Sequence, residues 1–310
     1  MTAVLRVGAA LAFMSVAVMT SPIAAQDASA RRTEVNAPVV GILGAGINGQ
    51  MTQMLWDISR VTSQEGEVRV LPILGGGSLS NINDLLYLRG VDGAMIQSDV
   101  LTFYERIGVE EGLERKLKYV APLGTQMAHL LAREDIETID DLAGKRVNFG
   151  RSTSGTVISA GNLFDELNLT VEAHNMSHRK ALKAIRNGEL DAMFWMTAPP
   201  ADLLQSIAAT EGLHLLSIPP ERIADESYEA VTIQRSTYEN LTDQNVATVG
   251  VKTLLAVYNW PAGHERYAKV KRFADAFRAQ FDVLKEAPYH PVFQTVDLTD
   301  EVPGQWVRFE

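Results

Sequence analysis

From residue 39 onward the chain alternates short apolar runs with amphipathic stretches. The run Val39–Leu43 has the length and residue types of a buried strand, and Met51–Thr62 follows with apolar residues at helical spacing. Further apolar runs at Val68–Ile73 and Gly93–Ile96 continue the alternation. Strands that alternate with helices build a sheet that the helices cover, so the pattern predicts an α/β fold.

A second series of the same kind begins near residue 139. It contains predicted strands at Arg146–Phe149 and Asp191–Trp195, and a predicted helix at Thr156–Leu167 lies between them. Long extended stretches precede and follow this series. Two series joined by two crossings predict two α/β lobes with a cleft between them. The expected bounds are residues 26–126 and 238–310 for lobe 1, and residues 127–237 for lobe 2.

Residues 1–25 have the composition of a secretory signal. Arg6 supplies the charged start, Val7–Met19 is an uncharged apolar run, and Ser21–Ala25 supplies small residues for cleavage. The apolar run is too short to span a hydrocarbon core of about 30 Å as a permanent helix. We therefore expect a cleaved signal peptide, a periplasmic mature chain and a loose polar leader at Gln26–Asn36, with an uncleaved anchor as the alternative.

Composition narrows the class of protein. A hydrophobic content of 46% with 21% charged residues is typical of a globular chain with a core. The net charge of −10 argues against nucleic acid as a partner, because such binding needs a basic surface. The chain contains no cysteine, which excludes thiol catalysis and cysteine-ligated metal sites.

The segment Gly44–Gly49 matches G-x-G-x-x-G between a predicted strand and a predicted helix. One interpretation is a dinucleotide site. However, the next strand ends at Leu71–Leu74 without the acidic residue that would hold a ribose, and nicotinamide cofactors are scarce outside the cytoplasm. We favour a Gly-rich turn that brings the backbone close to a ligand and expect no cofactor.

Polar or glycine-rich segments also follow the next two predicted strands, at Gly75–Asn81 and Gln97–Asp99. Ligands of open α/β sheets gather at the carboxyl ends of strands, so three such loops predict a converging site. Each loop taken singly has ordinary turn chemistry as its alternative. The contacts expected from lobe 1 are Asn48, Gly76, Gly77, Ser78, Asn81, Gln97 and Ser98.

Lobe 2 repeats this arrangement at Gly150–Thr156, where hydroxyl and N–H groups precede a helix and favour an anion. Arg151 either pairs with a ligand carboxylate or faces solvent, and both interpretations stay open. Trp195 either lines the cleft or belongs to the core. The contacts expected from lobe 2 are Arg151, Ser152, Ser154, Gly155, Thr156 and Trp195.

The sequence contains few of the motifs that indicate a hydrolase or a metal site. The chain has neither G-x-S-x-G nor H-E-x-x-H. His174 and His178 stand four residues apart without an obvious third ligand, which favours a surface pair over a metal site. We therefore expect no catalytic residues and no metal.

Taken together, these segments resemble the TAXI family of solute-binding proteins, which serve TRAP transporters. The resemblance covers roughly residues 39–258. The matching segments, in the order of the family, are Gly44–Gly49, Gly76–Ser78 with Asn81, Gln97–Asp99, Leu142–Val147, Ser154–Thr156, Gly188–Phe194 with Pro199, and Ser236–Tyr238 before Val246–Val249.

The chain also departs from this family. Gln50 and Met51 stand where a tyrosine usually follows the first Gly-rich turn. Ser80 replaces a common acidic residue, and Arg151 replaces a small one. The tail at Pro288–Trp306 differs as well. Several of these positions are expected to contact the ligand, so the resemblance does not identify it.

The resemblance implies the type II periplasmic-binding fold and the capture of a small organic anion, a carboxylate or an amino acid, between the lobes. It also implies delivery of that ligand to the membrane subunits of a TRAP permease. We expect a monomer. An ABC-type binding protein of the same fold, a sensor-linked binding protein and an exported enzyme remain as alternatives.

Overall fold

The computed structural model describes residues 22–47, 49–63 and 68–310 of the chain. Most of the predicted signal peptide, and the predicted contact residue Asn48, lie outside the described residues. The chain divides into two compact units, of which the second is Val39–Glu310. None of the described helices is both long and apolar enough to cross a membrane.

The described residues of the first unit, 22–38, form the helix α1 (Pro22–Asn36). The prediction of a loose leader at Gln26–Asn36 is therefore wrong. The segment is rich in alanine and arginine, which favour helices, and Pro22 stands at the first helical position, where its missing N–H costs nothing. Residues 28–37 are exposed, so helix propensity outweighs the absence of an apolar face within this unit.

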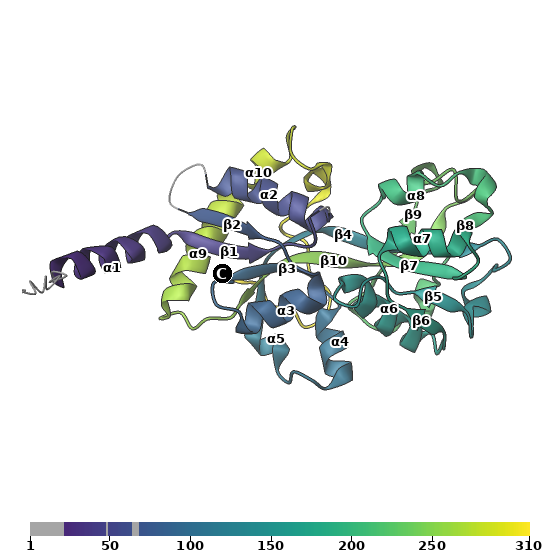
Figure 1. Ribbon diagram of the computed structural model, residues 1–310, viewed down its shortest axis with the longest axis horizontal. Helices are drawn as coiled ribbons and strands as arrows, with labels where there is room; N and C mark the ends of the chain where they lie inside the picture. The colour runs from purple at the N-terminus through teal and green to yellow at the C-terminus, as the bar shows by residue number, and fades with distance from the viewer. Residues whose placement is uncertain (1–21, 48, 64–67) are drawn as a thin grey trace, which may run out of the picture. The chain divides into compact units, whose positions relative to one another are not determined.

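The second unit is built on one ten-stranded sheet with the order β2-β1-β3-β10-β4-β7-β5-β6, to which β8 adds at β4 and β9 at β10 (Figure 1). The strands are β1 (Val39–Leu43), β2 (Arg69–Ile73), β3 (Gly93–Gln97), β4 (Leu117–Arg133), β5 (Arg146–Asn148), β6 (Glu172–His174), β7 (Ala192–Thr197), β8 (Leu213–Leu216), β9 (Glu229–Ile233) and β10 (Val246–Tyr258).

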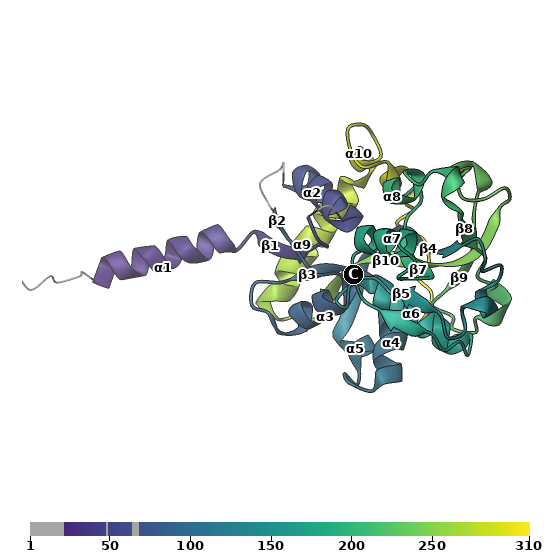
Figure 2. The ribbon, with the colours of Figure 1, turned by 45° about the vertical axis from the view of Figure 1, so that its right-hand side comes forward.

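Two parallel groups of strands confirm the predicted α/β fold with two lobes. Strand β1 runs parallel to β2 and β3 in lobe 1, and β5 runs parallel to β6 and β7 in lobe 2. The long strands β4 and β10 are antiparallel and pass between the groups (Figure 2). Strand β4 pairs with β10 up to Met127 and with β7 from Met127 onward, so it leaves one lobe and enters the other at that residue.

Helices cover the sheet. The α-helices of the second unit are α2 (Gln50–Thr62), α3 (Ser78–Tyr87), α4 (Val100–Ile107), α5 (Leu113–Lys116), α6 (Gly155–Glu166), α7 (His178–Arg186), α8 (Asp202–Gln205), α9 (Glu265–Ala279) and α10 (Phe281–Leu284). Short 3₁₀ helices are η1 (Ile139–Leu142), η2 (Ala209–Glu211), η3 (Pro220–Arg222), η4 (Arg235–Thr237) and η5 (Pro291–Thr295).

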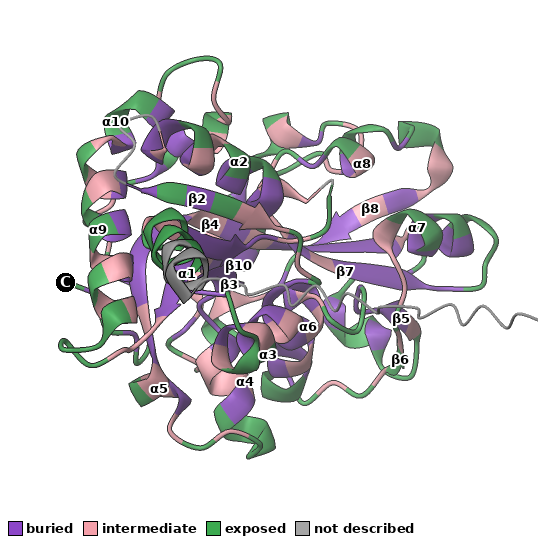
Figure 3. Ribbon diagram, turned by 60° about the vertical axis from the view of Figure 1, so that its left-hand side comes forward, coloured by how far each residue is buried: buried purple, intermediate pink, exposed green. Residues whose placement is uncertain are grey.

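Each lobe buries apolar side chains between its strands and its helices (Figure 3). In lobe 1, Leu55 of α2 and Phe273 of α9 belong to one cluster, and Ile82 of α3 belongs to another. In lobe 2, Leu163 of α6 and Ile185 of α7 belong to two further clusters. Both lobes therefore present the carboxyl ends of their parallel strands from a packed scaffold, and the loops that follow those ends are positioned by it.

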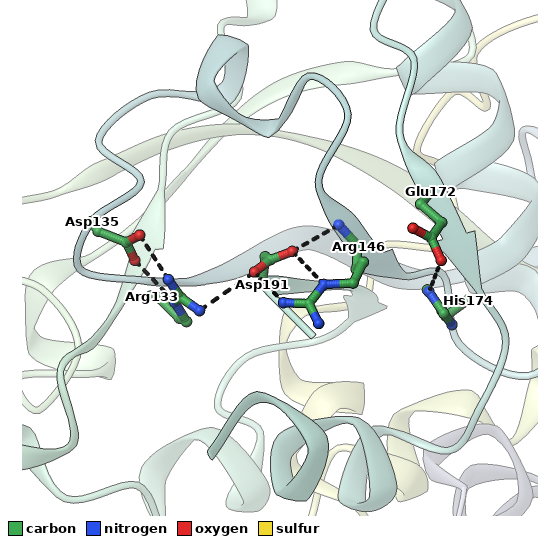
Figure 4. Close-up of polar contacts among 6 residues, drawn as sticks. All are labelled: Arg133, Asp135, Arg146, Glu172, His174 and Asp191. Carbon is green, nitrogen blue, oxygen red and sulfur yellow. Dashed lines mark hydrogen bonds and ion pairs between the residues drawn. The ribbon is translucent and has the colours of Figure 1, made fainter. Parts of the chain in front are cut away.

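A half-buried ion pair joins three strands of lobe 2. Asp191, directly before β7, accepts hydrogen bonds from N, Nε and Nη2 of Arg146 on β5 at 2.9, 2.9 and 2.8 Å (Figure 4). Nη1 of Arg133, the last residue of β4, lies 3.5 Å from the same carboxylate. These bonds, above all those from Arg146, lower the pKa of Asp191 to about 2. The carboxylate thus fixes the starts of β5 and β7 relative to the end of β4.

Candidate functional site

The loop before α3 in lobe 1 lies directly against the loop before α6 in lobe 2. Oγ1 of Thr153 donates a hydrogen bond to the carbonyl of Gly76 at 3.2 Å, and N of Ser80 donates to the carbonyl of Thr153 at 3.4 Å. Gly77 has φ +119°, and a Cβ there would lie 2.8 Å from Cα of Ser154. Both the conformation and the close approach require glycine. We call this contact, between residues 76–80 and 153–155, the seam.

Two further predicted residues, Ser78 and Gln97, are buried beside the seam. Oγ of Ser78 donates to Oε1 of Gln97 at 3.3 Å and accepts from N of Gln97 at 3.1 Å. Gly155 of the opposite lobe packs on the Gln97 side chain. The three residues therefore contact one another, and a ligand reaches them only when the lobes separate.

The seam brings together the N-termini of two helices. Gly77 and Ser154 are the N-caps of α3 and α6, and neither makes a side-chain capping bond. The Ser154 hydroxyl instead donates to the carbonyl of Arg151 at 2.7 Å. The first N–H groups of both helices are thus left without a side-chain acceptor. The N–H of Ser80 donates to the carbonyl of Thr153, but the other N–H groups of these first turns and the positive ends of the helix dipoles favour an anion at this place.

Arg151 is exposed at the edge of the seam. Among the described residues its side chain has no hydrogen-bond or ion-pair partner. Its neighbour Ser152 is also exposed, whereas Thr156 is buried in the first turn of α6. An unpaired guanidinium beside two helix N-termini is suited to bind a carboxylate in bidentate fashion.

Trp195, near the end of β7, stacks on His178 at the start of α7, with ring centroids 4.3 Å apart and planes 17° apart. Burial lowers the pKa of His178 to about 4, and the charge of Arg151 contributes in the same direction. The imidazole is therefore neutral near pH 7 and offers Trp195 an uncharged flat surface. His178 was not among the predicted contacts. Its place directly after the helix cap Ser177, beyond a strand, was the available signal.

The two predicted histidines face different partners. Nε2 of His174 lies 3.1 Å from Oε1 of Glu172, whereas His178 faces Trp195 (Figure 4 shows the His174 pair). Throughout the described part of the chain, no three side chains of His, Cys, Asp or Glu are grouped so that they would hold a metal ion.

Asn81 and Ser98 bind backbone groups of their own surroundings. Nδ2 of Asn81 donates to the carbonyls of Gly44 at 2.6 Å and Met95 at 2.9 Å, which joins the first loop to β3. Oγ of Ser98 accepts from N of Lys252 at 3.1 Å, and N of Ser98 donates to the carbonyl of Lys252 at 2.9 Å. Ser98 is thus anchored on β10, one of the two strands that connect the lobes.

Two cavities lie away from the predicted contacts. One of about 330 Å³ adjoins α4 and α5, and one of about 140 Å³ lies between α4 and α6. None of the predicted contact residues lines either of them. The predicted residues that meet at the seam in this conformation are Gly76, Gly77, Ser78, Ser154 and Gly155, and Gln97 contacts two of them, Ser78 and Gly155.

Residues 50–273 match the NMT1-like family, and the chain belongs to that family. Its fold is similar to that of the substrate-binding protein of an amino acid ABC transporter, with a TM-score of 0.50 and 10% identity over 83% of this chain and 96% of that chain. An ancestral arginine-binding protein bound to arginine matches with a TM-score of 0.50 and 11% identity, over 83% of this chain and 97% of that chain.

The ligand-binding core of GluR0 from Nostoc punctiforme, solved with L-glutamate, is also similar, with a TM-score of 0.47 and 14% identity over 83% of this chain and 96% of that chain. At such identities the first two structures show a shared fold. The chain therefore has the two-lobe α/β fold of periplasmic solute-binding proteins.

Proposed function

We propose that the chain is the extracytoplasmic solute-binding subunit of a TRAP-type transporter and that it captures a small organic anion, a carboxylate or an amino acid, between its lobes. The observation that carries this proposal is the meeting of the N-termini of α3 and α6, neither with a side-chain cap, beside Arg151, whose side chain has no partner among the described residues. Membership of the NMT1-like family and the solute-binding fold support it.

The proposed site recognises the negative charge of the ligand from both lobes. Each helix N-terminus carries the equivalent of about half a positive charge, and Arg151 adds a full one. Lobe closure removes water, and each hydrogen bond to a charged group then contributes about 1.5–3 kcal/mol. The neutral His178 and the half-buried Trp195 add no charge, so they suit the uncharged part of the ligand.

Closure requires rotation about the strands that connect the lobes. We place lobe 1 at residues 39–126 and 238–310 and lobe 2 at residues 127–237, the bounds that the sequence predicts except that residues 26–38 belong to the first unit. The rotation then falls near residues 125–131 of β4 and near residues 228–247, which run from β9 to the start of β10. Contacts between the lobes other than these connecting segments form when the lobes close and break when they open.

The partner is a membrane permease, and the sequence motifs favour the TRAP class. Similarity to the fold of an amino acid ABC transporter subunit makes an ABC permease the second candidate. A sensor-linked role stays as a further alternative. Uptake with the cognate permease distinguishes these: a TRAP system depends on a cation gradient, an ABC system depends on ATP, and a sensor supports neither. We propose further that the mature chain is periplasmic after cleavage of residues 1–25, monomeric and not an enzyme.

A thermal-shift screen of the mature chain tests ligand capture. The probes are amino acids, dicarboxylates, 2-oxo acids and aromatic acids. A ligand at 100 times its Kd adds about 2.7 kcal/mol to stability, which raises Tm by several degrees. Recovery of that ligand unchanged after prolonged incubation supports capture. Conversion of the ligand, or no stabilisation by any anionic probe at millimolar concentration, contradicts the proposal.

A further inference from the structure

Asp99 lies buried where lobe 1 meets lobe 2. It follows Gln97 and Ser98 directly, stands at the N-cap position of α4 without a side-chain capping bond, and has no exposed surface. Its Oδ2 accepts a hydrogen bond from Oγ of Ser159 at 2.5 Å and from the hydroxyl of Tyr228 at 2.8 Å. Its main-chain carbonyl accepts from Nδ2 of Asn162 at 3.2 Å. Asp99 thus belongs to lobe 1, and all three donors belong to lobe 2.

Packing holds both sides of this contact in place. On the lobe 1 side, Val100, which directly follows Asp99, is fully buried in the apolar cluster that contains Ile82. Tyr228 packs against the apolar cluster of lobe 2 that contains Leu163. The Asp99 contact therefore joins two packed bodies, and a rotation of one relative to the other must break it.

The contact is also coupled to the predicted ligand loops and to the connecting strand. Nε2 of Gln97 donates to Oγ of Ser159 at 3.4 Å. Ser98 is hydrogen-bonded through its N–H and its hydroxyl to the main chain of Lys252 on β10. Because Ser98 is fixed to β10, Asp99 cannot follow lobe 2 when the lobes separate.

We propose that Asp99, Ser159 and Tyr228 form an interlobe latch that closes with the lobes and must break for them to open. This inference rests on the proposed capture function, because a latch of this kind sets how long a ligand is held. Asp99 acts by positioning the lobes and does not itself contact the ligand.

The electrostatics explain why both hydroxyls matter. Among the described residues Asp99 has no cationic partner. Asp225 lies near it, and Arg106, Asp165 and Glu166 line the adjacent cavity of about 140 Å³. Burial above all, with a smaller contribution from Asp225, raises the pKa of Asp99 to about 6, against the opposing effect of the two hydroxyls. Loss of one hydroxyl leaves a buried carboxylate with a single side-chain donor, which favours opening.

The distance between the lobes tests the latch. The chain has no cysteine, so spin labels on Val109→Cys and Lys180→Cys, two exposed positions in opposite lobes, report that distance by double electron–electron resonance. We expect Tyr228→Phe at pH 7.5 to raise the open-to-closed ratio at least about tenfold, since a hydrogen bond to a buried charge is lost. The matched control is Tyr104→Phe, which removes a hydroxyl from α4 that has no hydrogen-bond partner among the described residues; it should leave the ratio unchanged.

The same Tyr228→Phe substitution made in the Asp99→Asn variant tests whether the change in the open-to-closed ratio acts through Asp99. In Asp99→Asn the amide oxygen still accepts hydrogen bonds but no charge is buried, so Tyr228→Phe should shift the ratio much less there. An equal shift in both backgrounds, no shift in either, or the same shift with Tyr104→Phe overturns the latch. The measurement is made without any ligand, so its failure is distinct from failure of the ligand screen.

Discussion

A methyl group on Gly155 would lie 1.3 Å from Oε1 of Gln97, although the two residues belong to opposite lobes. Gly155 begins α6, and Gln97 ends β3 and is 1% exposed. The hydroxyl of Ser78 holds Gln97 in place, because it accepts a hydrogen bond from the main-chain N–H of Gln97 and donates one to its side-chain oxygen. The helix approaches lobe 1 this closely because residue 155 has no side chain.

Gly155→Ala should therefore hold the lobes apart. The added methyl group displaces Gln97 from a buried position, which favours the open state and weakens binding of an anion found by the thermal-shift screen by at least about tenfold. Isothermal titration calorimetry measures the change. Gly263→Ala is the control, because a methyl group there meets no described heavy atom within 4 Å. Wild-type affinity in Gly155→Ala would show that ligand binding does not need this contact.

Arg151→Ala should lower the affinity for the same anion at least tenfold, or about 1.4 kcal/mol, because an unpaired guanidinium is lost from the site. Its unfolding free energy should change by less than about 0.5 kcal/mol, since the side chain is exposed. Calorimetry and urea denaturation give the two values. Arg179→Ala, at an exposed arginine of α7, serves as control. Unchanged affinity would remove Arg151 from the proposed site.

Periodicity along the chain was sufficient to predict the α/β class and the two lobes, because it reflects which residues each strand and helix buries. The Gly-rich loops were predicted to bring the backbone close to a ligand, and that remains a prediction. However, at Gly77 and Gly155 the approaching group in this conformation is the opposite lobe. A glycine shows that space is tight without showing what fills it. The prediction of a loose leader was wrong because the residues of α1 have no apolar periodicity from which a helix could be recognised.

The polar pairings could not be predicted from sequence. Asp99 finds its partners Ser159 and Tyr228 at separations of 60 and 129 residues. Ser98, expected at the ligand, is committed to Lys252 at a separation of 154 residues. Such contacts depend on how the lobes dock, and no local pattern encodes them. Gln97, Ser98 and Asp99 are consecutive polar residues, but each therefore binds a different part of the protein.

The Asp191–Arg146 pair should stabilise the chain at neutral pH. Because the folded pKa of Asp191 is lowered to about 2, its contribution is present above the ordinary value of 3.8 and is lost as the pH falls through 2. Arg146 is one-third exposed, so solvent screening reduces the contribution to about 1–2 kcal/mol.

Arg146→Met should therefore lower the unfolding free energy by about that amount at pH 7 and by less at pH 3, as urea denaturation at the two pH values measures. Lys271→Met, which removes an exposed ion pair with Asp275, should change it by less than about 0.5 kcal/mol. An equal loss at both pH values would assign the effect of Arg146 to packing instead of to the charge of Asp191.

Acid should favour closed lobes through Asp99. The pKa of this carboxyl is about 6 when the lobes bury it, and it returns towards 3.8 when they open and water reaches it. Protonation therefore stabilises the closed state. This stabilisation is complete below the pKa of the open state and is lost as the pH rises through 6.

From pH 4.5 to 7.5, the open-to-closed ratio should rise by an order of magnitude or more, and Asp99→Asn should abolish that rise. Asp191 does not interfere, since it titrates below this range. A pH-independent lobe distance in the wild type, or the same pH dependence in Asp99→Asn, would show that Asp99 does not couple protonation to closure.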